Sequence, residues 1–194
     1  NIPNINPNSR ENYMQLRDAE FIVIDVETTG LSVTNGDRII EIAAVKVKNK
    51  EVTATFESLI NPQMVLSEEV QGIHHISNDM LKDAPLAEDI LPDLVNFVGG
   101  SCLVGHNIKF DLDFICYQLA DCGRKLKEET PALDTLKMAR DLLPTCQRYR
   151  LIDLSLSFGL HIENTHRALA DVLLTKDVFY HLIDHAEHQG MTMI

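Results

Sequence analysis

The stretch from Phe21 to Gly30, which reads FIVIDVETTG, restricts most strongly what this chain can fold into. Four apolar residues lead directly into two acids that stand two positions apart, Asp25 and Glu27. Because successive side chains of a β-strand point to opposite faces, these two carboxylates project to the same side. Two such acids repel each other and resist burial as ions unless a divalent cation lies between them. The stretch predicts a strand that carries part of a metal site, and the alternative is a strand that simply ends in a polar turn.

Composition limits the classes of protein to which the chain can belong. Its 194 residues, 45% of them hydrophobic, can bury one sizeable core, most simply in a single α/β domain. The formal net charge of −12 excludes a protein that holds nucleic acid by bulk electrostatic attraction, because phosphate binding relies on clustered Lys and Arg. No apolar run reaches the ~18–20 residues of a membrane span. The four cysteines lack the spacing of a zinc site, which predicts reduced thiols in a cytoplasmic protein.

Hydrophobic patterns and turn residues divide the chain into a polar tail and one domain. Residues 1–20 read as a polar linker or tail, residues 21–190 as the domain, and residues 61–77 as a polar connection. Strands are expected at residues 21–26, 38–47, 51–60, 101–105 and 131–134. Helices are expected at residues 84–98, 108–122, 135–143, 151–158 and about 166–189. Strands followed by alternating helices and strands predict a mixed sheet covered by helices.

Two further acids lie on predicted helices. Asp111 lies about 100° around the helix axis from Phe110, at the edge of an apolar stripe. Asp171 heads another stripe, in line with Leu174 and Val178. Each acid alone is either a charge at the border of a buried face or a ligand directed at a site beside the sheet.

A histidine precedes the last predicted helix. His166 lies five residues before Asp171, about 140° away on an ideal helix, so the two cannot share a helical face. His166 is therefore expected at the entry to the helix, where Asn164 or Thr165 could cap it. Such a histidine is usually ordinary, and it becomes a candidate general base only because the acids give it a site to serve.

The four acids are more informative together than singly. Oxygen-only ligands suit hard cations such as Mg²⁺ or Mn²⁺ rather than zinc. Two such ions about 3.5–4 Å apart stabilise the attacking and leaving oxygens in phosphodiester cleavage. The set of acids therefore favours a metal-dependent phosphodiester hydrolase.

Three stretches, in this order along the chain, resemble the sequence motifs of the DnaQ-like superfamily of 3′–5′ exonucleases that carry the DEDDh signature. FIVIDVETTG resembles the first motif, GHNIKFDLDF, from Gly105 to Phe114, the second, and HRALADV, from His166 to Val172, the third. The resemblance spans nearly everything after the tail. It implies a ribonuclease-H-like core of five mixed strands, two bound Mg²⁺ or Mn²⁺ ions and release of nucleoside monophosphates from a free 3′ end in a bacterial cytoplasmic protein.

The resemblance also implies roles for individual residues. Asp25, Glu27, Asp111 and Asp171 match the metal ligands of the family, and His166 matches its general base. Wild-type-like 3′-end release by variants lacking Asp25 and His166 would contradict this assignment.

The same resemblance implies substrate contacts beside the catalytic residues. Thr28, Ile73, His74 and Phe110 match family residues that hold the terminal nucleotide, although Phe110 could belong to the core and His74 to an ordinary loop. His75 departs from the pattern, because relatives often have Gly there, which puts the local backbone in doubt.

Two further residues belong to the second motif. His106 and Asn107 are expected to shape its turn, with a possible substrate contact.

Substrate and partner stay open at the level of sequence. DNA, single-stranded or with frayed ends, is the favoured substrate, and a 3′–5′ exoribonuclease of the ribonuclease-T or oligoribonuclease type is the alternative. A different class would be a non-catalytic interaction module of a polymerase or of a CRISPR spacer-acquisition complex. The Asn- and Pro-rich start, which lacks Met, is compatible with fusion to another domain. No membrane contact is expected.

Overall fold

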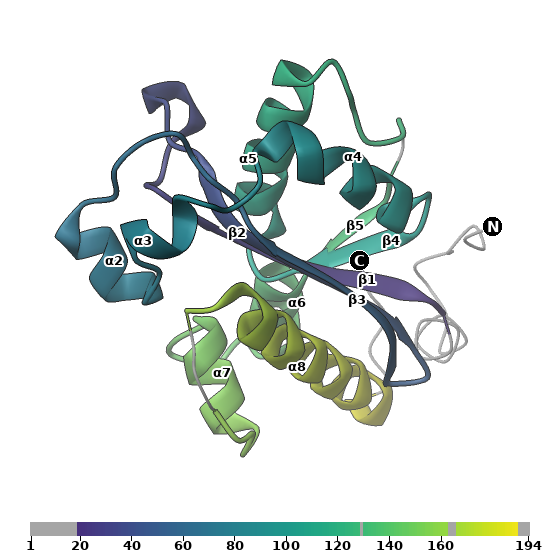
Figure 1. Ribbon diagram of the computed structural model, residues 1–194. Coiled ribbons are helices and arrows are strands. Elements are labelled where there is room, and N and C mark those ends of the chain that lie inside the picture. The colour runs from purple at the N-terminus through teal and green to yellow at the C-terminus, as the bar shows by residue number, and fades with distance from the viewer. Residues whose placement is uncertain (1–18, 129, 163–165, 190–194) are drawn as a thin grey trace.

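The computed structural model describes residues 19–128, 130–162 and 166–189. Its centre is a mixed five-stranded sheet with the strand order β3-β2-β1-β4-β5 (Figure 1). The strands are β1 (Phe21–Thr28), β2 (Ile39–Lys48), β3 (Glu51–Leu59), β4 (Cys102–Gly105) and β5 (Ala132–Asp134). Strand β2 runs antiparallel to both β1 and β3, whereas β4 runs parallel to β1, and β5 to β4. The carboxyl ends of β1, β4 and β5 therefore lie at the same end of the sheet, which is the usual place for a functional site in an open α/β sheet.

Helices cover the two faces of this sheet (Figure 1). The helical segments are η1 (Val33–Asn35), α2 (Glu68–His74), α3 (Asn78–Leu81), α4 (Ala87–Val98), α5 (Ile108–Asp121), α6 (Thr135–Leu142), α7 (Leu151–Ser157) and α8 (Ala168–Gln189). Helices α4 and α5 pack on one face, α6 and α8 on the other, and α7 packs against α8. None of these helices is long and apolar enough to cross a membrane.

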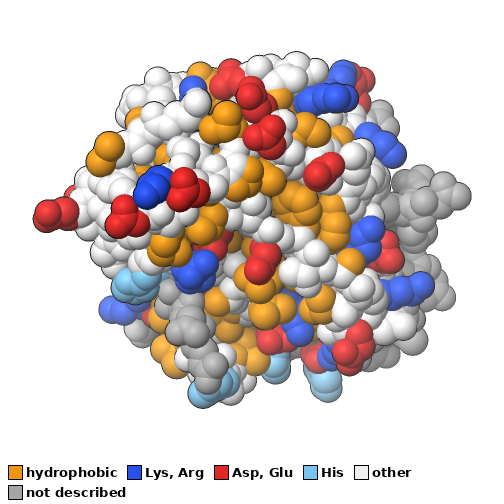
Figure 2. Space-filling model, in the orientation of Figure 1, with side chains coloured by type: hydrophobic (Ala, Val, Ile, Leu, Met, Phe, Trp, Pro, Cys, Tyr) orange, Lys and Arg blue, Asp and Glu red, His pale blue; other side chains and the backbone are white. Residues whose placement is uncertain are grey.

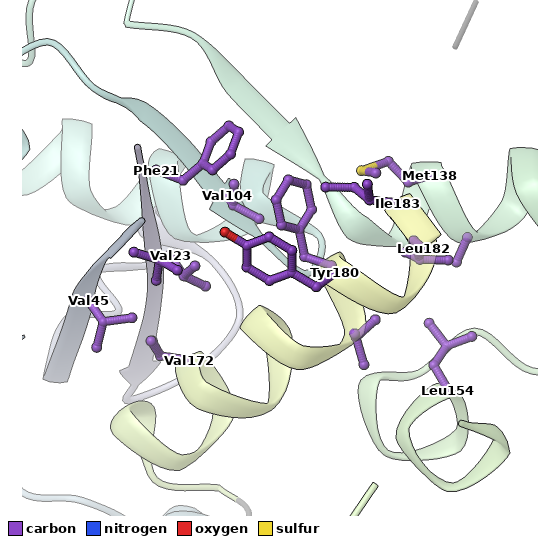
Figure 3. Close-up of a cluster of buried hydrophobic side chains, with 14 of the residues drawn as sticks. Phe21, Val23, Val45, Val104, Met138, Leu154, Val172, Tyr180, Leu182 and Ile183 are labelled. Atoms are coloured by element: carbon purple, nitrogen blue, oxygen red, sulfur yellow. The ribbon is translucent and has the colours of Figure 1, made fainter. Parts of the chain in front are cut away.

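Alternation along β1 gives each face of the sheet its own core. Phe21 and Val23 point toward α8, where Phe179 packs edge-on against Phe21 with ring centroids 5.2 Å apart. Figure 3 shows this cluster, with Phe21, Val23 and Val172 among its labelled side chains. Ile22 and Ile24 point to the opposite core beneath α4 and α5. Because Asp25 continues the row of Phe21 and Val23, its carboxylate emerges on the α8 face at the end of the strand.

The sheet and most of its helices confirm the prediction from sequence, with differences at particular segments. Strand β1 continues to Thr28 because its pairing with β2 continues through Glu27 opposite Glu41 and, after a bulge, Thr28 opposite Ile39. The polar connection 61–77 was predicted without helices, and this was wrong. Ser67 caps α2 within this segment and Ser77 caps α3 directly after it, by accepting hydrogen bonds from the backbone N–H groups of Val70 and Met80.

The other differences concern helix starts and the tail. Helix α4 begins at Ala87 rather than at residue 84 and continues through Pro92. Helix α8 begins at Ala168, two residues after His166, which confirms that His166 precedes the helix. The expected caps Asn164 and Thr165, and nearly all of the tail 1–20, lie outside the described residues.

Candidate active site

Three carboxylates meet at the carboxyl end of β1. Asp25 and Glu27 come from β1, and Asp171 comes from the first turns of α8. One oxygen of each carboxylate lies within 4.8 Å of the others, an arrangement that could hold a metal ion. Glu27 is buried, and Asp25 and Asp171 are half-buried. The sheet and the helix that packs on it therefore bring together acids that are far apart in sequence.

The fourth acid reaches the same strand from the opposite face of the sheet. Asp111 lies in the first turn of α5 and is only 3% exposed. Its Oδ1 accepts a hydrogen bond of 3.0 Å from the backbone N–H of Val26, the residue between the two strand acids. Asp111 thus borders the cluster but does not belong to the group of three.

The surroundings of Asp25, Asp111 and Asp171 disfavour the ionised form of these three acids. Burial, together with the neighbouring charges of Asp111 and Glu27, raises the pKa of Asp25 well above its usual value. Burial also raises the pKa of Asp111 to about 8, although the Val26 N–H opposes the shift. For Asp171, burial and the charge of Glu27 raise the pKa to about 6. The cluster therefore carries mutually repelling acids that a cation would stabilise in their ionised form.

The chemistry of these side chains fits a divalent cation. The donor set consists of carboxylate oxygens, which hard cations such as Mg²⁺ and Mn²⁺ prefer. Asp25, Glu27 and Asp171 would hold such an ion directly. Asp111, whose charge acts on Asp25, would be the fourth carboxylate ligand.

His166 lies two residues before the start of α8, with its backbone in the left-handed region at φ of 67°. Its N–H donates a hydrogen bond of 3.0 Å to Asp171 Oδ2, and its side chain is exposed. A non-glycine residue in this conformation is uncommon and persists only where neighbouring contacts hold it. The same carboxylate that belongs to the acid cluster therefore also fixes the backbone of the candidate base.

The residues expected to hold a nucleotide have different surroundings. Thr28 is buried, and its hydroxyl donates to the carbonyl of Gly30 at 2.6 Å. Ile73, on α2, is 44% exposed and free to contact a ligand. Phe110 packs against Phe114 with ring centroids 5.0 Å apart, so part of its ring belongs to the core.

The neighbouring histidines of α2 also differ in their contacts. His74 belongs to the helix rather than to a loop, and its Nδ1 lies against Glu27 Oε2. His75 ends the helix with a left-handed backbone, at φ of 56°. Glycine is favoured in this conformation because it lacks a Cβ. The departure from the family pattern at His75 thus falls on a position with a physical preference for Gly.

The turn after β4 is shaped as expected by His106 and Asn107. Asn107 has φ of 64°, and its N–H donates to Asp134 Oδ1 at 2.9 Å. The same oxygen of Asp134 accepts from the N–H of Leu136, so it anchors the turn to the start of α6. His106 Nδ1 lies 2.9 Å from the hydroxyl of Thr135, and burial lowers the pKa of the imidazole. Both residues therefore make internal contacts in the structure.

An ion pair beside the cluster was missed from the sequence. Glu41, on β2, is 7% exposed and accepts hydrogen bonds from the guanidinium of Arg167, the shortest at 2.6 Å. Its other oxygen accepts from the N–H of Ala168 at 2.9 Å. The sequence feature that could have indicated this ion pair is the single acid within the apolar run IIEIAAV, because a buried acid usually has a charged partner.

A groove of about 1220 Å³ adjoins the site. It runs between β3, α3 and the start of α8, and His166, Arg167 and Glu41 lie along it with apolar residues such as Met80 and Leu173. On the face of the molecule shown in Figure 2, basic and acidic side chains are interspersed around hydrophobic ones, without a broad basic surface among the described residues. Recognition of a polyanion at this site therefore requires local groups or bound cations.

Sequence comparisons place the chain among exonucleases. A family model described as "Exonuclease" (RNase_T) matches residues 22–179. DNA polymerase III PolC-type of Caldanaerobacter subterraneus subsp. tengcongensis is 39% identical over 91% of this chain, which spans only 12% of that relative. DNA polymerase III subunit epsilon of Aquifex aeolicus is 35% identical over 92% of this chain and 87% of the relative.

Solved structures agree with the fold. Exonuclease X in complex with 5′ overhanging duplex DNA is 29% identical, with a TM-score of 0.67 over 89% of this chain and 94% of that chain. Exonuclease I of E. coli, in complex with a dT13 oligonucleotide, is 17% identical and has a TM-score of 0.76 over 88% of this chain and 42% of its own. The second likeness concerns the fold alone.

The match along most of the chain, the ribonuclease-H-like sheet and the carboxylate cluster lead to one conclusion: this chain belongs to the DnaQ-like exonuclease family, together with DNA polymerase III subunit epsilon.

Proposed function

We propose that the chain is a 3′–5′ exonuclease that releases nucleoside monophosphates from DNA with two divalent cations and a histidine base. The main support is the convergence of Asp25, Glu27 and Asp171, whose oxygens lie within 4.8 Å of one another. Asp111 adjoins this cluster through Val26. So many buried, repelling acids are costly to the fold unless they bind cations.

In the proposed mechanism, each residue has a distinct task. When bound, two Mg²⁺ or Mn²⁺ ions would stabilise the charge on the attacking and leaving oxygens. Asp25, Glu27, Asp111 and Asp171 would hold the ions, and two dications would offset their four negative charges. His166 accepts a proton from the attacking water, a role suited to the range in which imidazole titrates. The exposed position of its side chain beside Asp171 leaves room for a substrate.

The neighbouring residues are proposed to hold the terminal nucleotide. Ile73 offers an exposed apolar surface, and the ring of Phe110, which packs on Phe114, is only partly buried. Thr28, His74, His106 and Asn107 shape the walls of the site, and their internal hydrogen bonds and contacts favour a supporting role.

Single-stranded or frayed DNA is the proposed substrate. Two relatives are named as DNA polymerase III components, and the structure of Exonuclease X is a complex with 5′ overhanging duplex DNA. The net charge of −12 predicts weak binding along the strand, so we propose that a polymerase presents the DNA end to residues 21–190 acting as a domain. These relatives favour a polymerase as partner over a CRISPR spacer-acquisition complex.

Direction and substrate are tested by one digestion experiment. Matched single-stranded DNA and RNA, each labelled at the 5′ end, are incubated with Mn²⁺ and either the wild-type protein or the Asp25→Ala and His166→Ala variants. We expect a ladder of shortened DNA, slower shortening of RNA, and loss of both with either variant. Immediate release of the 5′ label would contradict the 3′–5′ direction, and wild-type rates in the variants would contradict the mechanism.

A further inference from the structure

The ion pair between Glu41 and Arg167 lies between the sheet and the start of α8, next to the site. Glu41 is 7% exposed, and Arg167 donates to both of its carboxylate oxygens from Nε at 3.1 Å and to one from Nη2 at 2.6 Å. This forked contact fixes the guanidinium in one orientation. The N–H of Ala168 adds a third donor at 2.9 Å, so Glu41 also caps the first residue of α8.

The residues that this carboxylate holds are the immediate neighbours of the candidate base. Arg167 stands between His166 and Ala168, and its carbonyl accepts the N–H of Asp171 at 3.1 Å. His166 in turn has the left-handed φ of 67° and donates its N–H to Asp171. A strained backbone of this kind persists where surrounding contacts over-determine it. Glu41 supplies those contacts from the rigid sheet, through both the side chain of Arg167 and the backbone of Ala168.

The position of Glu41 on the sheet gives a second reason for its ion pair with Arg167. On the sheet, Glu41 pairs directly opposite Glu27, a member of the acid cluster. Like charges at directly opposed positions of antiparallel strands repel each other. The guanidinium of Arg167 offsets the charge of Glu41 and keeps its oxygens engaged, so that Glu41 stands apart from the cation-binding acids.

We propose that Glu41 and Arg167 form a positioning pair, which holds His166 and the start of α8 in register with the carboxylates of β1. This inference rests on the proposed nuclease function and adds two residues to it. Neither residue touches the reacting atoms in this role. Their effect passes through the backbone of His166 and through Asp171.

Because the side chain of Arg167 is 39% exposed and lies along the groove, it could instead bind a substrate phosphate. The two roles differ in their kinetics. Loss of a phosphate contact raises KM, whereas misplacement of a base lowers kcat.

The test compares four variants in single-stranded DNA digestion at saturating Mn²⁺: Arg167→Met, Arg167→Lys, Glu41→Gln and the double variant Glu41→Gln with Arg167→Met. For Arg167→Met we expect kcat to fall about 10–100-fold, the range found for residues that orient a metal site, with little change in KM. Arg167→Lys keeps the charge but not the fork, so its loss should be smaller. Glu41→Gln keeps an oxygen that can accept from the Ala168 N–H. The kcat of the double variant should fall less than the product of the two single reductions, because Glu41 and Arg167 act as one pair.

Two control variants separate positioning from stability. Lys50→Gln breaks another ion pair with α8, the 3.1 Å contact between Lys50 in the β2–β3 turn and Asp184 near the far end of the helix. Ile183→Val removes a buried methyl group from the same helix. Both should retain the wild-type kcat, whatever their effect on Tm.

The outcomes are distinct. A wild-type kcat in Arg167→Met and Glu41→Gln, with only Tm lowered, would overturn the proposal, and so would a raised KM with unchanged kcat. If Arg167→Met does not fold, the kcat and KM of Arg167→Lys and Glu41→Gln decide between the same outcomes. An inactive wild-type protein would instead contradict the proposed function itself.

Discussion

The backbone N–H of Val26 donates a hydrogen bond of 3.0 Å to Asp111 Oδ1, across the end of the sheet. This contact ties α5 to β1 at the one residue between Asp25 and Glu27. Asp111 therefore both borders the acid cluster and accepts a hydrogen bond from a buried N–H group.

Two substitutions of Asp111 separate these roles. Both Asp111→Asn and Asp111→Ala remove the charge, but only Asn keeps an oxygen that can accept from Val26. We expect Asp111→Ala to be less stable than Asp111→Asn by about 1–3 kcal/mol, the cost of leaving a buried donor unsatisfied. Urea unfolding of both variants without metal measures this difference. Equal stability would contradict the structural role.

Removal of one strand acid should stabilise the metal-free protein. The charges of Asp111 and Glu27 and burial oppose ionisation of Asp25. Asp25→Asn relieves this repulsion, and a gain of about 1 kcal/mol corresponds to a Tm roughly 2–4 °C higher for a chain of this size. Thermal unfolding in EDTA checks this, with Asp113→Asn as control, because Asp113 is half-exposed on α5 and pairs with Lys109. Addition of Mn²⁺ should then raise the Tm of the wild-type protein far more than that of Asp25→Asn.

The stability of the metal-free protein should fall as the pH rises. Folding raises the pKa of Asp171 to about 6 and that of Asp111 to about 8 from the usual 3.8, so the folded state binds more protons than the unfolded state between about pH 4 and 8. The free energy of unfolding therefore decreases with pH in this window. Tm measured in EDTA should be higher at pH 5 than at pH 8, and the rise caused by Mn²⁺ should be larger at pH 8. A Tm that increases over this range without metal would contradict the raised pKa values.

His75 is the natural place for a stabilising substitution. Its φ of 56° costs an L-residue roughly 1–2 kcal/mol. Glycine avoids this cost, but part of the gain is lost because glycine has more conformational freedom in the unfolded chain. We expect His75→Gly to raise the free energy of unfolding by about 1 kcal/mol, whereas His75→Ala, which keeps the Cβ, should not. Chemical denaturation of the three proteins provides the comparison, and an equal effect of Gly and Ala would rule out backbone strain as the cause.

Much of the architecture was predictable because local patterns and the global fold agree. Apolar runs that end at turn residues predicted β1 and β2, and the spacing of Asp25 and Glu27 placed both acids on one face of β1. The separation between His166 and Asp171 correctly placed the histidine before the helix. These features depend on residues that are close together in the chain, so a single sequence is enough to predict them.

The features that were missed depend on contacts between distant segments. Helices α2 and α3 are short and have few buried residues, so the sequence shows no strong apolar periodicity there that would predict them. Glu41 and Arg167 are 126 positions apart, and only the folded sheet brings the acid of β2 against the start of α8. The burial of Asp111 likewise depends on how α5 crosses the end of β1, which its helical pattern left open.

The most direct measurement is the rate of 3′-nucleotide release from single-stranded DNA as Mn²⁺ is titrated into metal-free protein, for the wild type and for Asp171→Asn. We predict no release in EDTA, a saturable increase with Mn²⁺ for the wild type, and a severe loss for the variant, because Asp171 belongs to the proposed cation site and accepts the backbone N–H of His166. Release that continues in EDTA, or an unchanged metal response in Asp171→Asn, would contradict a cation-dependent nuclease site at the end of β1.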